Sequence, residues 1–136
     1  MRIVLDTNVL VSGLYNPDGP PGRIIDLVLG GVLQVLYDDR ILREYMDVLK
    51  RPELSIEPTL AQAIVRYIRL SGERVTGLPL PESTLPDLDD LPFAEIAISG
   101  KAEAMVTGNV KHFSMVRDLE DRIFSPAQFL RLVGRR

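Results

Sequence analysis

Short apolar runs alternate with helical patterns along almost the whole chain, and this alternation restricts the possible folds more than any other feature. Runs with the length of buried strands occupy residues 3–5, 32–37, 104–106 and 122–124, and the more polar residues 74–77 are a candidate for a further short strand. Helical spacing of apolar residues, or a helix-start signal, predicts helices over residues 23–29, 40–50, 59–70, 93–99 and from 125 onward. Because alternating strands and helices form βαβ units, the sequence predicts an α/β fold with a parallel sheet.

The composition is that of an ordinary globular protein, with 46% hydrophobic and 26% charged residues. The chain of 136 residues has the size of one domain, so we expect residues 1–136 to form a single domain. No apolar run is long enough to span a membrane and the N-terminus has no signal-peptide pattern. We therefore expect no membrane association, and a cytoplasmic location fits.

Several classes of site are excluded by the residue types present. The chain has no cysteine, which excludes disulfides, thiol catalysis and zinc–thiolate sites. His112 is the only histidine, so a histidine-rich metal site is excluded as well. The net charge of −3 argues against a surface that binds polyanions everywhere, although it is compatible with a local basic rim around an acidic pocket.

Asp6 follows the first predicted strand directly, in the sequence MRIVLDTNVL. In parallel α/β sheets, ligands collect beyond the carboxyl ends of the strands, where the strand order reverses. Polar residues follow two other predicted strands in the same way: Asp38 and Asp39 after the second, and residues 107–109 after the fourth. The alternative for Asp6 is that it, or Thr7, caps the next helix.

Two further acids could join Asp6 at this edge of the sheet. Glu44 borders the apolar stripe of its predicted helix, and a carboxylate at the edge of a buried face costs free energy unless it is paired or binds a metal. The alternative is an exposed Glu44 that pairs with Arg40 or Lys50. Asp90 stands just before a predicted helix, where the alternative is again capping.

The other acids of this region have more than one interpretation. Asp87 and Asp89 are expected to be solvated loop acids, although either could cap in place of Asp90. Glu95 could be a secondary ligand or a plain surface residue.

Several carboxylates gathered at one edge of a sheet would repel one another, and some would have to take up protons. A divalent cation relieves this repulsion, and Mg²⁺ and Mn²⁺ prefer oxygen ligands. Such a site supports metal-assisted displacement at phosphorus with water as the nucleophile. Convergence of these acids would therefore indicate metal-dependent phosphodiester chemistry.

Five motifs, in order along the chain, give it a resemblance to a known family. They are VLDTNVL at 4–10, LREY at 42–45 with Val48-Leu49 and Arg51-Pro52, the acids of 87–90 with Phe93 and Ala97, VTGN at 106–109 with His112-Phe113, and SPAQFL at 125–130. With these motifs the chain resembles the PIN-domain family of metal-dependent ribonucleases. The resemblance covers essentially the whole chain and is closest to the VapC-like branch, which contains toxins of bacterial and archaeal toxin–antitoxin pairs.

The resemblance implies a three-layer α/β/α fold in which about five parallel strands have the order 3-2-1-4-5. By position, Asp6, Glu44 and Asp90 match the family's metal-binding catalytic acids. Asn109 stands where many members have a fourth aspartate, and its amide is expected to assist catalysis by ligation or by orienting water. Two further residues match polar positions that shape the same pocket: Asn8 and Thr107.

The function implied by the resemblance is that of a Mg²⁺- or Mn²⁺-dependent endoribonuclease, which hydrolyses single-stranded RNA with metal-activated water. Arg40, Arg43 and Lys111 are candidates for contacts with the RNA phosphates. Similar proteins are inhibited by a small antitoxin and commonly dimerise. A cognate antitoxin protein and a homodimer are therefore the expected partners.

Three alternatives have to be weighed against this hypothesis. A receiver-type regulatory module would need an acidic pair after the first strand and a lysine after the fifth, and the chain supplies neither. A phosphatase with an aspartyl nucleophile favours a second aspartate two residues after the first, where this chain has Asn8. A PIN fold that has lost its nuclease activity and acts as a binding partner stays open, because Asn109 removes one negative charge from the site.

Overall fold

The computed structural model describes residues 1–134, which contain a parallel five-stranded sheet. In chain order, its strands are β1 (Arg2–Leu5), β2 (Gln34–Tyr37), β3 (Glu73–Arg74), β4 (Ala104–Val106) and β5 (Ile123–Phe124). Their order across the sheet is β3-β2-β1-β4-β5, and every neighbouring pair is parallel. The predicted α/β class and strand order are confirmed.

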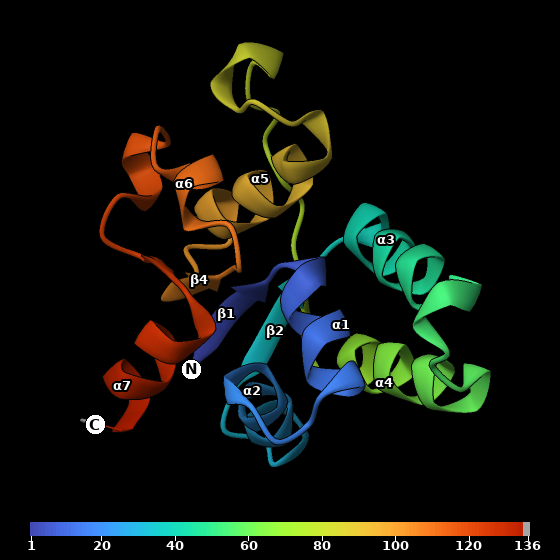
Figure 1. The fold of residues 1–136 in the computed structure, drawn as a ribbon. Coiled ribbons are helices and arrows are strands. Elements are labelled where there is room, and N and C mark those ends of the chain that lie inside the picture. The colour runs from blue at the N-terminus through green and yellow to red at the C-terminus, as the bar shows by residue number, and fades with distance from the viewer. Residues whose placement is uncertain (135–136) are drawn as a thin grey trace.

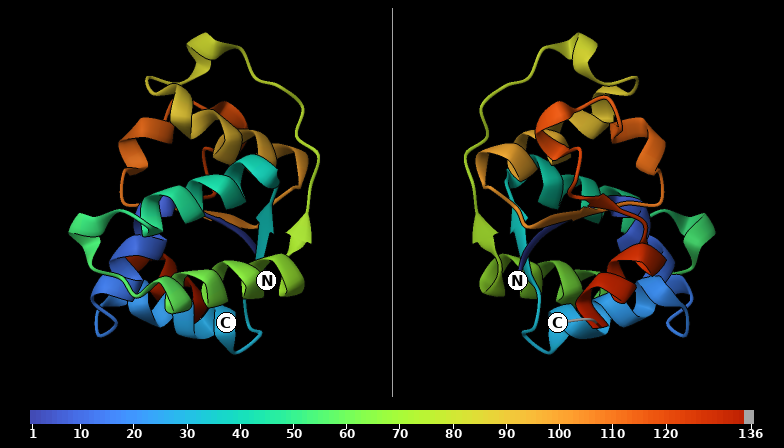
Figure 2. Two further views of the ribbon diagram at one scale, coloured as in Figure 1. Left: turned by 90° about the vertical axis from the view of Figure 1, so that its right-hand side faces the viewer. Right: turned by 90° about the vertical axis from the view of Figure 1, so that its left-hand side faces the viewer.

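Helices cover both faces of this sheet. They are α1 (Thr7–Tyr15), α2 (Pro20–Leu29), α3 (Asp39–Leu49), α4 (Pro58–Ser71), α5 (Leu91–Ser99), α6 (Val110–Phe113) and α7 (Pro126–Gly134). The two views of Figure 2 show α1, α2, α4 and α7 on one face and α5 with α6 on the other. Helix α3 contacts both layers, α1 and α4 on one side and α5 on the other (Figure 1). The arrangement has the three predicted layers.

The central strand β1 is buried on both faces. Ile3, Val4 and Leu5 are at most 1% exposed, and the neighbouring strand β4 is buried throughout. A strand covered on both faces needs apolar side chains in both directions, which explains the continuous apolar run at the start of the chain. Because β1 lies between β2 and β4, its carboxyl end lies where the strand order reverses.

Some boundaries differ from those predicted. Strand β2 begins two residues late, because the amides of Val32 and Leu33 donate to the Leu27 carbonyl and close the turn after α2. Strand β3 occupies Glu73–Arg74 instead of residues 74–77. Helices α1 and α6 were not predicted, whereas the other helices occur with slightly shifted ends. Within residues 1–134, no helix combines the length and apolar character needed to cross a membrane.

Candidate functional site

Asp6 lies between β1 and α1, with its side chain only 5% exposed. It occupies the N-cap position of α1 but makes no side-chain cap hydrogen bond, so the capping alternative is wrong. Its Oδ2 instead accepts hydrogen bonds from Thr107 Oγ1 at 2.7 Å and from Asn8 Nδ2 at 3.4 Å. The carboxylate is therefore held in place by residues of the predicted pocket.

The loop after β4 is bonded to the loop after β1. Thr107 is fully buried, and its hydroxyl accepts from the backbone amide of Asn109 at 3.0 Å while it donates to Asp6. The amide of Gly108 donates to Asn8 Oδ1 at 3.1 Å. These bonds connect the ends of two adjacent strands, since Leu5 of β1 lies opposite Val106 of β4. Asn8 and Thr107 thus both lie beside the Asp6 carboxylate, and their part in a functional pocket stays a prediction.

Glu44 is brought to this region by α3. Its Oε2 accepts a hydrogen bond from the hydroxyl of Thr7, the first residue of α1. The alternative pairing of Glu44 with Arg40 is wrong, because Arg40 binds two other carboxylates. Tyr45, the next residue, is fully buried and donates from its hydroxyl to the Leu5 carbonyl, which fixes α3 against the end of β1.

Asp90 ends a short turn, Leu88–Asp90, and directly precedes α5. It makes no side-chain cap bond, whereas Asp87 caps the turn by accepting from the amide of Asp89 at 2.9 Å. Its Oδ2 is buried and has no hydrogen-bond partner among residues 1–134. The imidazole Nδ1 of His112 lies 3.4 Å from this oxygen, outside hydrogen-bond geometry. A buried carboxylate oxygen without a donor is suited to a cation.

The three carboxyl groups are close enough to affect one another's ionisation. Burial raises the pKa of Asp6, and the charge of Asp90 adds to this, although the Thr107 bond works in the opposite direction. Burial likewise raises the pKa of Glu44, with Asp6 among the charges that reinforce the effect. Burial raises the pKa of Asp90 and the charges of Asp87 and Glu44 raise it further, although His112 works in the opposite direction. The structure therefore brings Asp6, Glu44 and Asp90 into one electrostatically coupled group.

This group fits a divalent cation by its chemistry, although its side chains do not form a finished coordination shell. Within residues 1–134, no three acidic or histidine side chains are already arranged around a metal-sized position. The donor set nevertheless consists of carboxylate oxygens from three elements, one of them buried without a partner. Carboxylates are the ligands that Mg²⁺ and Mn²⁺ prefer, and Mg²⁺ requires only one or two of them.

Asn109 is attached to this group less closely than predicted. It is exposed and precedes α6, and its recorded bond to the pocket comes from its backbone amide to Thr107. Within residues 1–134, the structure gives its side chain no hydrogen bond to any of the three acids. A part in ligation therefore stays a prediction.

Two residues beside the acids have contacts that were not predicted from the sequence. Thr7 was considered only as a cap, and the His112 ring was not connected with Asp90, although both lie within the quoted motifs. Arg40, one of the candidates for phosphate contacts, is half exposed and binds Asp38 and Glu95, so its contact with phosphate stays a prediction. Glu95 is 5% exposed, which excludes a plain surface residue.

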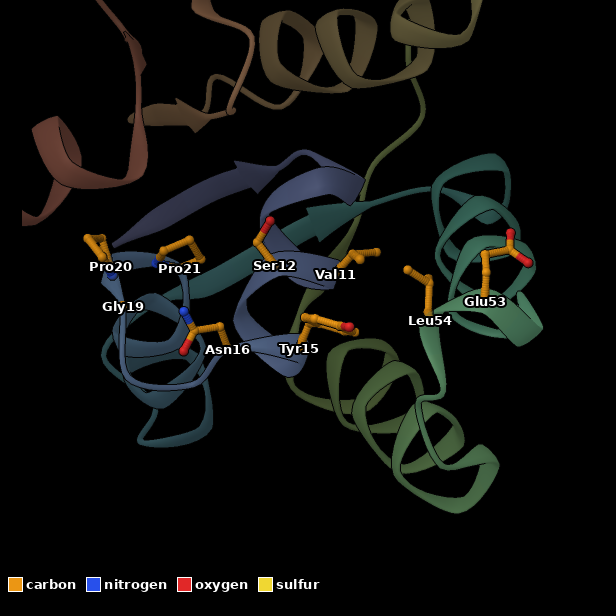
Figure 3. A pocket seen from close by; sticks show the side chains of 9 residues that line it. All are labelled: Val11, Ser12, Tyr15, Asn16, Gly19, Pro20, Pro21, Glu53 and Leu54. Atoms are coloured by element: carbon orange, nitrogen blue, oxygen red, sulfur yellow. The ribbon is translucent and has the colours of Figure 1, made fainter.

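A surface pocket of about 460 Å³ lies elsewhere, between α1, the start of α2 and the turn after α3 (Figure 3). Its walls include Val11, Tyr15 and Leu54, and none of the predicted site residues lines it. This pocket is therefore separate from the acidic group.

Comparison with known proteins gives three results. A family model described as "PIN domain" matches residues 2–111. The uncharacterized protein MJ1680 of Methanocaldococcus jannaschii is 30% identical over 121 residues, which are 87% of this chain and 76% of that protein. A chain of the crystal structure of VapBC2 from Rickettsia felis bound to a DNA fragment from their promoter superposes with a TM-score of 0.58. That match covers 92% of this chain and 98% of the other at 16% identity, and so it shows a shared fold.

Proposed function

Because the chain belongs to the PIN domain family, we propose that it is a metal-dependent endoribonuclease that cleaves single-stranded RNA. The observation that carries the proposal is the placement of three carboxyl groups: Asp6 is bonded to Thr107, Glu44 is bonded to Thr7 beside Asp6, and Asp90 has a buried oxygen without a hydrogen-bond partner among residues 1–134. Residues 1–136 would act as one domain in the cytoplasm. The family and the shared fold support this class of function, and the acidic group supports its chemistry.

In this proposal, Asp6, Glu44 and Asp90 hold a Mg²⁺ or Mn²⁺ ion. When bound, such an ion makes water nucleophilic at neutral pH and stabilises the leaving oxygen of the phosphodiester. Thr107 and Asn8 keep the Asp6 carboxylate in one orientation, and Thr7 does the same for Glu44. Because these donors are already in place, the carboxylates lose little conformational freedom when they bind.

Asn109 supplies an amide in place of a fourth carboxylate, so its part is to ligate weakly or to orient a water. Arg40, Arg43 and Lys111 are exposed and are the candidates for phosphate contacts. An RNA phosphate would be attracted to these cations and would otherwise be repelled by the acidic group.

We also propose that the protein is the toxin of a toxin–antitoxin pair. The structural neighbour is a VapBC2 complex, which supports an antitoxin protein as the partner of this chain. A homodimer is proposed on the resemblance to VapC-like proteins.

The test is cleavage of a single-stranded RNA with Mn²⁺ or with EDTA, comparing the native protein with Asp6→Asn. A matched control is Asp26→Asn, which removes an exposed acid from α2, on the opposite side of α1 from α3. We expect cleavage by the native protein and by the control in Mn²⁺, and none in EDTA or by Asp6→Asn. Cleavage that ignores both EDTA and the Asp6 substitution would refute the mechanism. Absence of cleavage with several unrelated RNAs would favour a PIN fold that serves as a binding partner.

A further inference from the structure

We propose that the ion pair between Arg40 and Glu95 is a positioning pair that sets the separation of Glu44 and Asp90. It would thereby set the affinity of the acidic group for a divalent cation, and in this respect it rests on the proposed function. Within residues 1–134, neither residue has a hydrogen bond or ion pair with the three acids, so the pair would act through the helices that carry them.

Glu95 uses both of its carboxylate oxygens. Its Oε1 accepts from Arg40 Nη1 at 2.7 Å, and its Oε2 accepts from the backbone amide of Leu80 at 2.7 Å. Arg40 in turn donates from Nε to Asp38 Oδ2 at 2.8 Å, and the Oδ1 of Asp38 accepts from the Ile41 amide at 3.0 Å. This network joins the end of β2, the first turn of α3, the body of α5 and the segment that follows β3.

The two ends of the ion pair lie on the elements that carry two of the site acids. Arg40 is four residues before Glu44 on α3, so the two side chains lie on neighbouring turns of one helix. Glu95 is on α5, and Asp90 directly precedes the first residue of this helix. Among the ion pairs of residues 1–134, the one between Arg40 and Glu95 connects α3 with α5.

Glu95 also holds the chain that leads to Asp90. The bond from Leu80 fixes this segment on α5, and the Leu78 amide adds a second bond to Ser99 Oγ at 2.9 Å. At Gly77 the backbone runs so close to the helix that an added Cβ would lie 3.3 Å from Glu95 Cβ. The start of the loop is therefore positioned by the same residue that binds α3.

Stability alone is a weak reason for this arrangement. Glu95 is buried and Arg40 is half exposed, and an ion pair of this kind usually adds little net stability, because the buried charge must be removed from water while the exposed one is screened by it. The pair does supply a fixed geometry, since the planar guanidinium of Arg40 binds Glu95 and Asp38 in defined directions. A fixed geometry matters where carboxylates from two helices must meet around one small ion.

The test measures Mn²⁺ binding directly, from the loss of the electron paramagnetic resonance signal of free Mn²⁺ on titration with protein. The variants are Glu95→Gln, which removes the charge at nearly unchanged size, and Arg40→Lys, which keeps the charge but loses the planar fork. The matched control is Arg74→Lys, because Arg74 joins β3 to Asp39 of α3 without reaching α5. The melting temperature of each protein is measured in EDTA.

We expect Glu95→Gln to bind Mn²⁺ about tenfold more weakly, which is the low end of the effect of outer-shell partners of metal ligands. Arg40→Lys should weaken binding in the same direction, and Arg74→Lys should bind as the native protein does. A purely structural pair would lower the melting temperature in EDTA and leave Mn²⁺ affinity unchanged, which would overturn the inference. If Glu95→Gln does not fold, Arg40→Lys decides the question, because its side chain is half exposed and its charge is kept.

The result for the native protein separates the two proposals. If it binds Mn²⁺ and Glu95→Gln binds equally well, only the positioning role fails. If the native protein does not bind Mn²⁺, or if Asp6→Asn binds Mn²⁺ as well as the native protein does, the proposed function fails. The positioning role then fails with it.

Discussion

Replacing Thr107 with valine should destabilise the protein although the two side chains have nearly the same shape. The Thr107 hydroxyl is fully buried, donates to Asp6 Oδ2 at 2.7 Å and accepts from the Asn109 amide at 3.0 Å. A hydrogen bond to a charged group, such as the one to Asp6, contributes roughly 1.5–3 kcal/mol. The Asn109 amide belongs to an exposed residue, so water can replace the lost Thr107 hydroxyl as its acceptor. We therefore expect Thr107→Val to lose about 2–3 kcal/mol of unfolding free energy.

The assay is thermal unfolding in EDTA near neutral pH. For a chain of this size, this loss corresponds to a melting temperature lower by about 6–12 °C. The control is Thr107→Ser, which keeps the hydroxyl and loses only a buried methyl group, at a cost of about 1 kcal/mol. A valine variant as stable as the serine variant, or more stable, would refute the conclusion that Thr107 anchors the Asp6 carboxylate.

Three further predictions concern the ionisation of Asp6, the hydrogen bond of Tyr45 and the close packing at Gly22. The pKa of Asp6 in the folded protein is raised above its ordinary value of 3.8, so folding favours the protonated form of this residue. The resulting stabilisation is fully present below pH 3.8 and is lost as the pH rises through the pKa of the folded protein. In EDTA, the stability of the native protein relative to Asp6→Asn should therefore fall as pH rises above 3.8, and a difference that stays constant in urea titrations at several pH values would contradict this. Tyr45→Phe should cost about 0.5–1.5 kcal/mol in the same titrations, because the buried hydroxyl donates to the Leu5 carbonyl, and native stability would show that this bond is unimportant. Gly22→Ala should lower stability by about 1–3 kcal/mol, because a Cβ there would meet the Pro17 carbonyl oxygen at 2.1 Å, whereas Gly19→Ala, with its nearest neighbour at 3.8 Å, should be close to neutral in thermal unfolding.

The strands and most helices could be predicted because burial imposes its own pattern on the sequence. The apolar runs of β1 and β4 and the stripe on α3 are direct consequences of which faces are covered. Helix α1 gave no such signal, because it starts two residues after β1 without an intervening loop and is apolar around much of its surface. Helix α6 has only four residues, too few for a helical period to be recognised.

The sequence pointed to the predicted site acids, but for each of them it could not exclude an alternative role such as helix capping or ion pairing. Whether Asp6 and Asp90 cap their helices depends on side-chain direction, and residue type alone does not determine this. The alternative pairing of Glu44 with Arg40 could not be excluded from the sequence, because the two residues lie one turn apart on the same helix. In the structure Arg40 binds Glu95 instead, which is 55 residues distant. Such long-range competition between partners becomes visible only when α3 and α5 are placed side by side.

The most direct test of the proposed metal site is the anomalous difference map of a crystal of the native protein grown with Mn²⁺. We expect one strong peak within coordination distance of carboxylate oxygens from Asp6, Glu44 and Asp90, with Thr107 still bonded to Asp6. A fully occupied Mn²⁺ that lies elsewhere, with these three carboxylates pointing to solvent or to other partners, would contradict it.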